Sequence, residues 1–202
     1  MTLEQFYETY PKQSIGIEGK TFEYRYYKKD NAKATLVLLT GGIGLSDLFY
    51  EHFDCFAQEF SVVTFDYLEC YDNMEVFADA VGTLLKRLDE KVWLVGQSLG
   101  GFVAQVITHR QPDVVEGLVL SNTGSLEKGM DERALQNIKE MVEGQKKTKN
   151  LVRILPFGIL KKAMMKKVAR NAEKLPKEYR EHMMELTAAM FKILTKGMSF
   201  TC

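Results

Sequence analysis

The chain is poor in the features that would place a protein in a membrane or in an oxidising compartment. It has no run approaching the ~18 to 20 apolar residues that a membrane-spanning helix needs. Residues 1–5 lack the basic and apolar regions of a secretory signal peptide. The cysteines Cys55, Cys70 and Cys202 are odd in number and irregularly spaced, which predicts neither a disulfide framework nor a metal site. We therefore expect a cytoplasmic protein with reduced thiols, no metal and no transmembrane segment.

Neither sign of charge dominates, but the two signs are distributed unevenly along the chain. In total, 27 Lys and Arg residues balance 27 Asp and Glu residues. Residues 1–125 carry a net charge of −8 and residues 126–202 a net charge of +8. We interpret the basic segment as a solvated helical face or one attracted to the acidic body, with an anionic substrate or membrane surface as the alternative. We expect no nucleic-acid binding.

Strand-like and helix-like segments alternate over the first 125 residues. Residues 35–40 and 62–65 are almost continuously apolar, as in buried parallel strands, whereas residues 21–27 alternate as in a peripheral antiparallel strand. The other expected elements are helices over 46–60, 72–88 and 102–110, and strands over 92–95 and 114–120. This alternation predicts an α/β fold with a doubly wound, mostly parallel sheet and a functional site at the carboxyl ends of its strands.

Beyond Gly129 the pattern changes to long helices without strands. Helices are expected over residues 131–144, 158–173 and 177–195. Eight of the ten methionines lie in this segment, where they either fill a core or line a permissive pocket. We therefore divide the chain into a core of residues 1–125 and a helical segment of residues 126–202.

The most informative motif follows the expected strand 92–95 directly. It is a Gly-x-Ser-x-Gly sequence centred on Ser98, between Gly96 and Gly100. Glycines on either side carry no Cβ to clash, so the serine can occupy a strained backbone conformation that lifts its hydroxyl clear of the sheet. A strand before the motif and a helix after it predict a nucleophile elbow at Ser98.

With this motif placed, the chain resembles the α/β-hydrolase family, whose segments match in order. Residues 38–44 occupy the place of the family's oxyanion loop, and Thr40 stands where the family often has histidine. The resemblance implies that backbone N–H groups of Gly42 or Ile43, together with that of Leu99, form an oxyanion hole. It also implies that Ser98 is a catalytic nucleophile.

The same resemblance assigns roles to two further parts of the chain. Asp66 matches an aspartate that in the family organises a loop at the end of the fourth strand. The helices of residues 126–202 resemble a cap, which in the family roofs the active site and selects substrates. A basic, methionine-rich cap implies an apolar small-molecule substrate that carries an anionic group.

The acid and the histidine of the family's catalytic triad have no counterpart in this sequence. In the family they follow the seventh and eighth strands, and the chain ends before a motif for either, so we expect a form truncated before the last two strands. His52 and His109 do not match the family position. His182, with Glu178 or Glu185 nearby in sequence, is the alternative base.

Two hypotheses of function follow from these residues. The first is a serine hydrolase that acts on carboxylic esters or related acyl compounds without a cofactor. The alternative is a catalytically inactive hydrolase-fold protein with a binding or interaction role, which the absent acid and histidine favour. A nucleotide-binding role is disfavoured, because residues 41–44 lack the spacing of both common phosphate loops.

The expected last strand, residues 114–120, has the apolar pattern of a strand buried on both faces, but no later strand is present to pair with its outer edge. An uncovered sheet edge is a template for pairing with another chain. We expect this edge to be covered by the cap segment, by a second copy in a homodimer, or by a missing C-terminal piece.

Overall fold

The computed structural model describes residues 1–42, 44–67, 74–88, 91–126, 157–173 and 175–197. The chain divides into two compact units, Met1–Lys128 and Gly129–Thr201. Outside the described residues lie Ile43, Cys70, Cys202 and the helix expected over 131–144.

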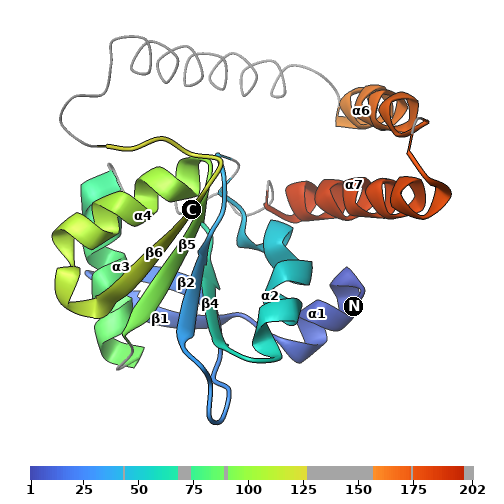
Figure 1. The fold of residues 1–202 in the computed structure, drawn as a ribbon. Helices are drawn as coiled ribbons and strands as arrows, with labels where there is room; N and C mark the ends of the chain where they lie inside the picture. Colours follow the sequence, from blue (N-terminus) through green and yellow to red (C-terminus); the bar gives the residue numbers. More distant parts are fainter. Residues whose placement is uncertain (43, 68–73, 89–90, 127–156, 174, 198–202) are drawn as a thin grey trace. The chain divides into compact units, whose positions relative to one another are not determined.

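The first unit is built on a six-stranded sheet in the order β1-β2-β4-β3-β5-β6 (Figure 1). The strands are β1 (Gln13–Ile17), β2 (Lys20–Tyr27), β3 (Thr35–Leu39), β4 (Ser61–Phe65), β5 (Val92–Gln97) and β6 (Val115–Ser121). The last four are parallel, and β1 and β2 pair antiparallel at one side of the sheet. The expected doubly wound, mostly parallel sheet is confirmed.

Helices cover both faces of this sheet. One face carries α3 (Met74–Leu88) and α4 (Leu99–Arg110), and the other carries α1 (Leu3–Thr9) and α2 (Tyr50–Ala57) (Figure 1). Every residue of β3 and β4 is buried, as expected for strands that pack against helices on both sides. The central strands are therefore held firmly by the core. Functional residues gather at the carboxyl ends of such strands.

The short elements α1 and β1 are not evident from the sequence pattern. Thr2 and Gln5 form a reciprocal capping box that begins α1, and the two residues Glu18 and Gly19, both with positive φ, turn β1 into β2. Because β1 pairs with the outer edge of β2, the strand predicted to be peripheral lies inside the sheet instead. The prediction that residues 21–27 form a peripheral strand is wrong in this respect.

The opposite edge strand, β6, is more exposed than its apolar sequence predicts. Val119 and Leu120 are 45% and 43% exposed, whereas a strand buried on both faces is expected there. Among the described strands, β6 pairs with β5 alone. The prediction of burial on both faces is therefore wrong for this part of the chain.

Two helices differ from the prediction, one in its type and one in its first residue. The helix expected over 46–60 is a short 3-10 helix, η1 (Ser46–Phe49), followed by α2. The helix expected over 102–110 begins three residues earlier, at Leu99. Glycines at positions 100 and 101 have low intrinsic helix propensity, so the early start is set by packing rather than by propensity.

The second unit contains two described helices, α6 (Phe157–Ala172) and α7 (Lys177–Gly197). Both match expected segments, and Pro176 separates them. Among the side chains that the structure describes in these helices, Ala172, Thr187, Phe191 and Ile193 are buried. Within the part of the chain that the structure describes, no helix is both long and apolar enough to cross a membrane.

Candidate active site

Ser98 occupies the turn between β5 and α4 in a backbone conformation that L-residues rarely adopt. Its φ is 54° and its ψ is −119°. The turn is held by hydrogen bonds on both sides: the Ser98 N–H donates to the Ser121 carbonyl at 3.0 Å, and the Gly101 N–H donates to the Ser98 carbonyl at 3.0 Å. A strained residue held by its surroundings at the carboxyl end of a strand is typical of functional sites.

The glycines around Ser98 are required by close backbone packing. A Cβ atom built on Gly96 would lie 2.5 Å from the carbonyl oxygen of Gly100. One built on Gly100 would lie 2.1 Å from the carbonyl oxygen of Leu39. Both distances are far below van der Waals contact, so any larger residue at either position would displace the turn.

The loop that follows β3 lies directly against Ser98. A Cβ atom on Gly41 would lie 3.5 Å from the Ser98 Cβ and 2.9 Å from the Gln97 Oε1. Gly42 follows and is exposed. Leu99 is the first residue of α4, where the backbone N–H has no acceptor within the helix. The structure thus places Gly41 next to Ser98, and Ile43 lies outside the described residues.

Tyr67 holds the first part of this loop, residues 40 and 44, by hydrogen bonds. The Tyr67 hydroxyl donates to the Thr40 carbonyl at 2.6 Å, and the Tyr67 N–H donates to the Gly44 carbonyl at 2.8 Å. Gly44 has a φ of 70°, and its N–H donates to the Gly41 carbonyl at 2.9 Å. Burial raises the pKa of Tyr67 above its usual range, so this hydroxyl stays a donor. The buried Thr40 Oγ1 has no hydrogen-bond partner among the described residues.

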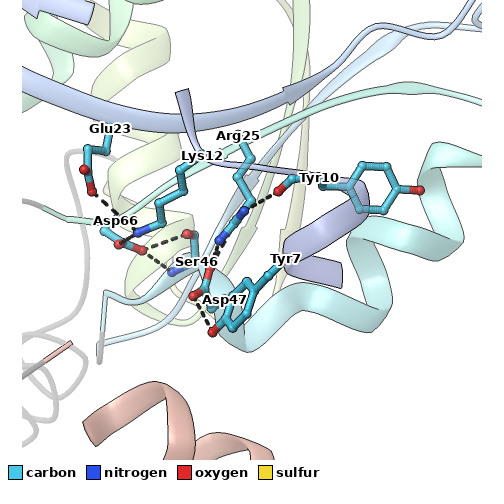
Figure 2. Close-up of polar contacts among 8 residues, drawn as sticks. All are labelled: Tyr7, Tyr10, Lys12, Glu23, Arg25, Ser46, Asp47 and Asp66. Atoms are coloured by element: carbon cyan, nitrogen blue, oxygen red, sulfur yellow. Dashed lines mark hydrogen bonds and ion pairs between the residues drawn. The ribbon is translucent and has the colours of Figure 1, made fainter. Parts of the chain in front are cut away.

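Asp66 holds the end of the loop at Ser46. Its Oδ1 accepts from both the N–H and the hydroxyl of Ser46, each at 2.7 Å, and its Oδ2 contacts the Lys12 Nζ at 2.6 Å (Figure 2). Burial alone would raise the pKa of Asp66, but the Lys12 ammonium and the Ser46 hydrogen bonds outweigh it and hold the pKa below its usual range. Asp66 is therefore an ionised loop anchor, as expected from the sequence.

The model of the alpha/beta hydrolase fold matches residues 34–177, which is more than half of the chain and includes the site around Ser98. This chain belongs to the alpha/beta hydrolase fold family. The six-stranded sheet is therefore that of an alpha/beta hydrolase fold.

Relatives of known name match parts of this hydrolase-fold chain. "Putative carbamate hydrolase RutD" of Agrobacterium fabrum is 26% identical over 113 residues, covering 50% of this chain and 43% of that protein. The protein of the same name in Acinetobacter baylyi is 29% identical over 98 residues, covering 43% of this chain and 37% of that protein. The chain therefore spans less than half the length of these curated relatives.

The solved structure of MenH from S. aureus resembles the chain more extensively. Its TM-score is 0.57 at 19% sequence identity, covering 82% of this chain and 69% of that chain. At this identity the likeness supports the fold alone.

The structure places His109 away from Ser98. His109 lies in the last turn of α4, about 15 Å along the helix from its start next to Ser98. His52 is exposed on α2, where its ring packs against that of Phe49 at 5.2 Å. His182 is exposed on α7 of the second unit. Within the described residues, no three His, Cys, Asp or Glu side chains are grouped to hold a metal ion.

Several residues around the loop are not found by sequence reasoning. Lys12, Arg25 and Asp47 form ion pairs at or next to the loop, and each pairs with a residue far away in the sequence. In strand β2, Arg25 occupies a charged position of an alternating pattern, which predicts an exposed side chain, but the side chain is only 4% exposed. The capping box of Thr2 and Gln5 is a local signal for α1, the helix that carries Tyr7.

Proposed function

We propose that this chain is the core of a serine hydrolase in which Ser98 is the nucleophile of a nucleophile elbow. The observation that carries the proposal is the conformation of Ser98, with its positive φ, between glycines and beside Gly41. Strain of this kind costs about 1–3 kcal/mol. An ordinary strand-to-helix turn does not require a strained residue, whereas a serine whose hydroxyl must project from the sheet as a nucleophile does.

In the proposed reaction, the Ser98 Oγ attacks the carbonyl carbon of an acyl substrate. The carbonyl oxygen takes up the negative charge and accepts hydrogen bonds from the N–H group of Leu99 and from that of Gly42 or Ile43, which act as the oxyanion hole. The serine proton passes to a base and from there to the leaving group, which departs as an acyl-enzyme forms. Water then releases the acid and restores Ser98. No metal and no cofactor enter these steps.

The base is proposed to be a histidine, as in serine hydrolases generally. His182, with Glu178 or Glu185 to orient it, is the candidate within the chain. The helical segment of residues 126–202 is proposed to act as a cap. Its eight methionines suit an apolar acyl group, because methionine side chains adapt to irregular ligands.

The proposed substrate class is a small carboxylic ester or a related acyl compound, with the protein in the cytoplasm. The relatives named as carbamate hydrolases extend the class to carbamates, whose carbonyl carbon is open to the same attack. The exposed β6 edge, with Val119 and Leu120, is the proposed contact of a homodimer.

The test is intact-mass analysis after exposure to a fluorophosphonate, because covalent capture requires an activated serine whatever the natural substrate. We expect a single adduct on the wild-type chain and on Ser14→Ala, which removes an exposed serine of β1. We expect no adduct on Ser98→Ala. An adduct that persists in folded Ser98→Ala would contradict the assignment of Ser98.

The second candidate is a catalytically inactive protein that keeps the hydrolase fold for binding. The observation that favours it is the position of His109, about 15 Å along α4 from Ser98. A folded wild-type chain that gives no adduct after prolonged exposure would support this candidate and would exclude the serine-hydrolase proposal for the chain.

A further inference from the structure

Asp47 is the second residue of η1 and follows directly after Ser46, the residue that Asp66 holds. The two carboxylate oxygens of Asp47 have different partners (Figure 2). Its Oδ1 accepts from the Arg25 Nε at 3.3 Å and from the Arg25 Nη2 at 3.1 Å, whereas its Oδ2 accepts from the Tyr7 hydroxyl at 2.9 Å. Asp47 is thus held from strand β2 and from helix α1 at once.

Arg25 joins these elements from a buried position. Its guanidinium carbon lies 4.9 Å from the centre of the Phe6 ring and 5.2 Å from that of the Tyr7 ring, both on α1. Its Nη1 donates to the Tyr10 carbonyl, and Tyr10 ends α1. A planar guanidinium can make this set of contacts, whereas a lysine ammonium cannot span them. The geometry therefore depends on arginine at this position.

The loop that approaches Ser98 is consequently fixed at two neighbouring residues from two directions. Asp66 and Lys12 hold Ser46, and Arg25 and Tyr7 hold Asp47. At its other end the loop continues from β3, whose residues are all buried. Gly41, which lies beside Ser98, belongs to the stretch of loop between buried β3 and the anchors at Ser46 and Asp47.

We infer that Arg25 is a positioning residue for the oxyanion hole, acting through Asp47 on the loop of residues 41–46. The inference rests on the proposed function of Ser98. Loss of one oxyanion donor costs about 10²–10³ in turnover, and a misplacement of about 1 Å costs about 10². A change at Arg25 that shifts the loop should therefore lower the rate of covalent capture by roughly 10- to 100-fold.

The test compares Arg25→Met and Tyr7→Phe with the matched control Arg110→Met. Arg110 pairs with Asp79 and Glu75 at the surface, at the end of α4 distant from Ser98. For each variant, the rate constant of fluorophosphonate capture and the apparent binding constant of the probe are measured separately. Hydrogen exchange is measured at the Gly44 and Ser46 amides, whose acceptors are the Gly41 carbonyl and Asp66.

We expect Arg25→Met to lower the capture rate constant by roughly 10- to 100-fold with little change in probe binding, and to speed exchange at both amides. Tyr7→Phe should do the same to a smaller extent, Arg25→Lys should restore part of the rate, and Arg110→Met should change neither readout. A merely structural ion pair would lower the melting temperature without selectively lowering the rate constant of capture in the folded protein.

The inference is overturned if folded Arg25→Met or Tyr7→Phe keeps both the wild-type capture rate and wild-type amide exchange. If Arg25→Met does not fold, Tyr7→Phe decides, since it removes one hydroxyl. If the wild-type chain is never captured, the proposed function fails, and exchange alone then decides the anchoring: faster exchange in the variants supports it and unchanged exchange overturns it.

Discussion

Gly100 passes so close to Leu39 that a Cβ atom on Gly100 would lie 2.1 Å from the Leu39 carbonyl oxygen and 2.6 Å from that of Thr40. Both obstructing atoms belong to the backbone of β3 and of the loop after it, so they cannot move aside as a flexible side chain would. Gly100, two residues after Ser98, therefore sets the distance between α4 and β3.

Gly100→Ala is expected to destabilise the protein by about 2 kcal/mol or more, because β3 or α4 must shift to admit the methyl group. Urea-induced unfolding measures the change. Gly16→Ala is the matched control: Gly16 has a negative φ, and a Cβ there meets nothing within 4 Å. Equal stabilities of the two variants would contradict the close packing described here.

Ser98→Gly is expected to be more stable than Ser98→Ala, by about 1 kcal/mol. Glycine relieves a strain of about 1–3 kcal/mol at a φ of 54°, and this gain is offset by about 0.5–1 kcal/mol of extra chain entropy in the unfolded state. At Ser14, in a β-strand, the order of the same two substitutions should reverse. Thermal unfolding of the four variants checks both signs, and a less stable Ser98→Gly would argue against strain at this turn.

The parts of the site that can be predicted from sequence are those set by near neighbours in the chain. The turn at Ser98 depends on glycines two residues away, and the place of Asp66 depends on the strand just before it. The anchor at Asp47 depends instead on Arg25, 22 residues away, and the anchor at Asp66 on Lys12, 54 residues away. Such pairings form only when β2 and α1 pack, so no local pattern reveals them.

The same reasoning explains the errors in the sheet. The alternating sequence of residues 21–27 predicts a strand with one exposed face, which is the pattern of a peripheral strand. Its position depends on whether another strand pairs beside it, and β1 is too short and too polar to be recognised. Likewise the apolar run of β6 indicates a covered strand, but its outer edge depends on a partner that the described residues do not contain.

The folding stability is expected to fall in alkaline solution because Tyr10, the residue that follows α1, loses its proton. Burial and a hydrogen bond to Asp54 raise the pKa of Tyr10 to about 12. Since the folded pKa lies above the unfolded value of about 10, the contribution is present below pH 10 and lost as the pH rises to about 12.

Tyr10→Phe should therefore lose less stability than the wild type between pH 10 and pH 12. Urea unfolding at a series of pH values measures the two slopes. The control is Tyr179→Phe, which removes a tyrosine that is 59% exposed on α7. A slope for Tyr10→Phe as steep as that of the control would show that the Tyr10 hydroxyl plays no part.

At acid pH, protonation of Asp66 is expected to be a main cause of the loss of folding stability. The folded pKa of Asp66 is lowered, because Lys12 and Ser46 outweigh the effect of burial. Its contribution is therefore present above the unfolded pKa of about 3.9 and is lost as the pH falls through the folded pKa. Asp66→Asn should reduce stability at pH 7 by about 1–3 kcal/mol, the cost of removing a hydrogen-bonded charge, and should weaken the acid dependence.

Glu59→Gln tests whether this effect belongs to the loop anchor or to ion pairs in general. Glu59 pairs with Lys33, and its side chain is 55% exposed, against 18% for Asp66. Pairs in water contribute little because solvent and salt screen them, so Glu59→Gln should keep nearly the wild-type stability at pH 7. Faster amide exchange at Ser46 should accompany the loss in Asp66→Asn and be absent in Glu59→Gln. If both variants lose the same stability and leave Ser46 protected, the loop is held by its own backbone turns and not by Asp66.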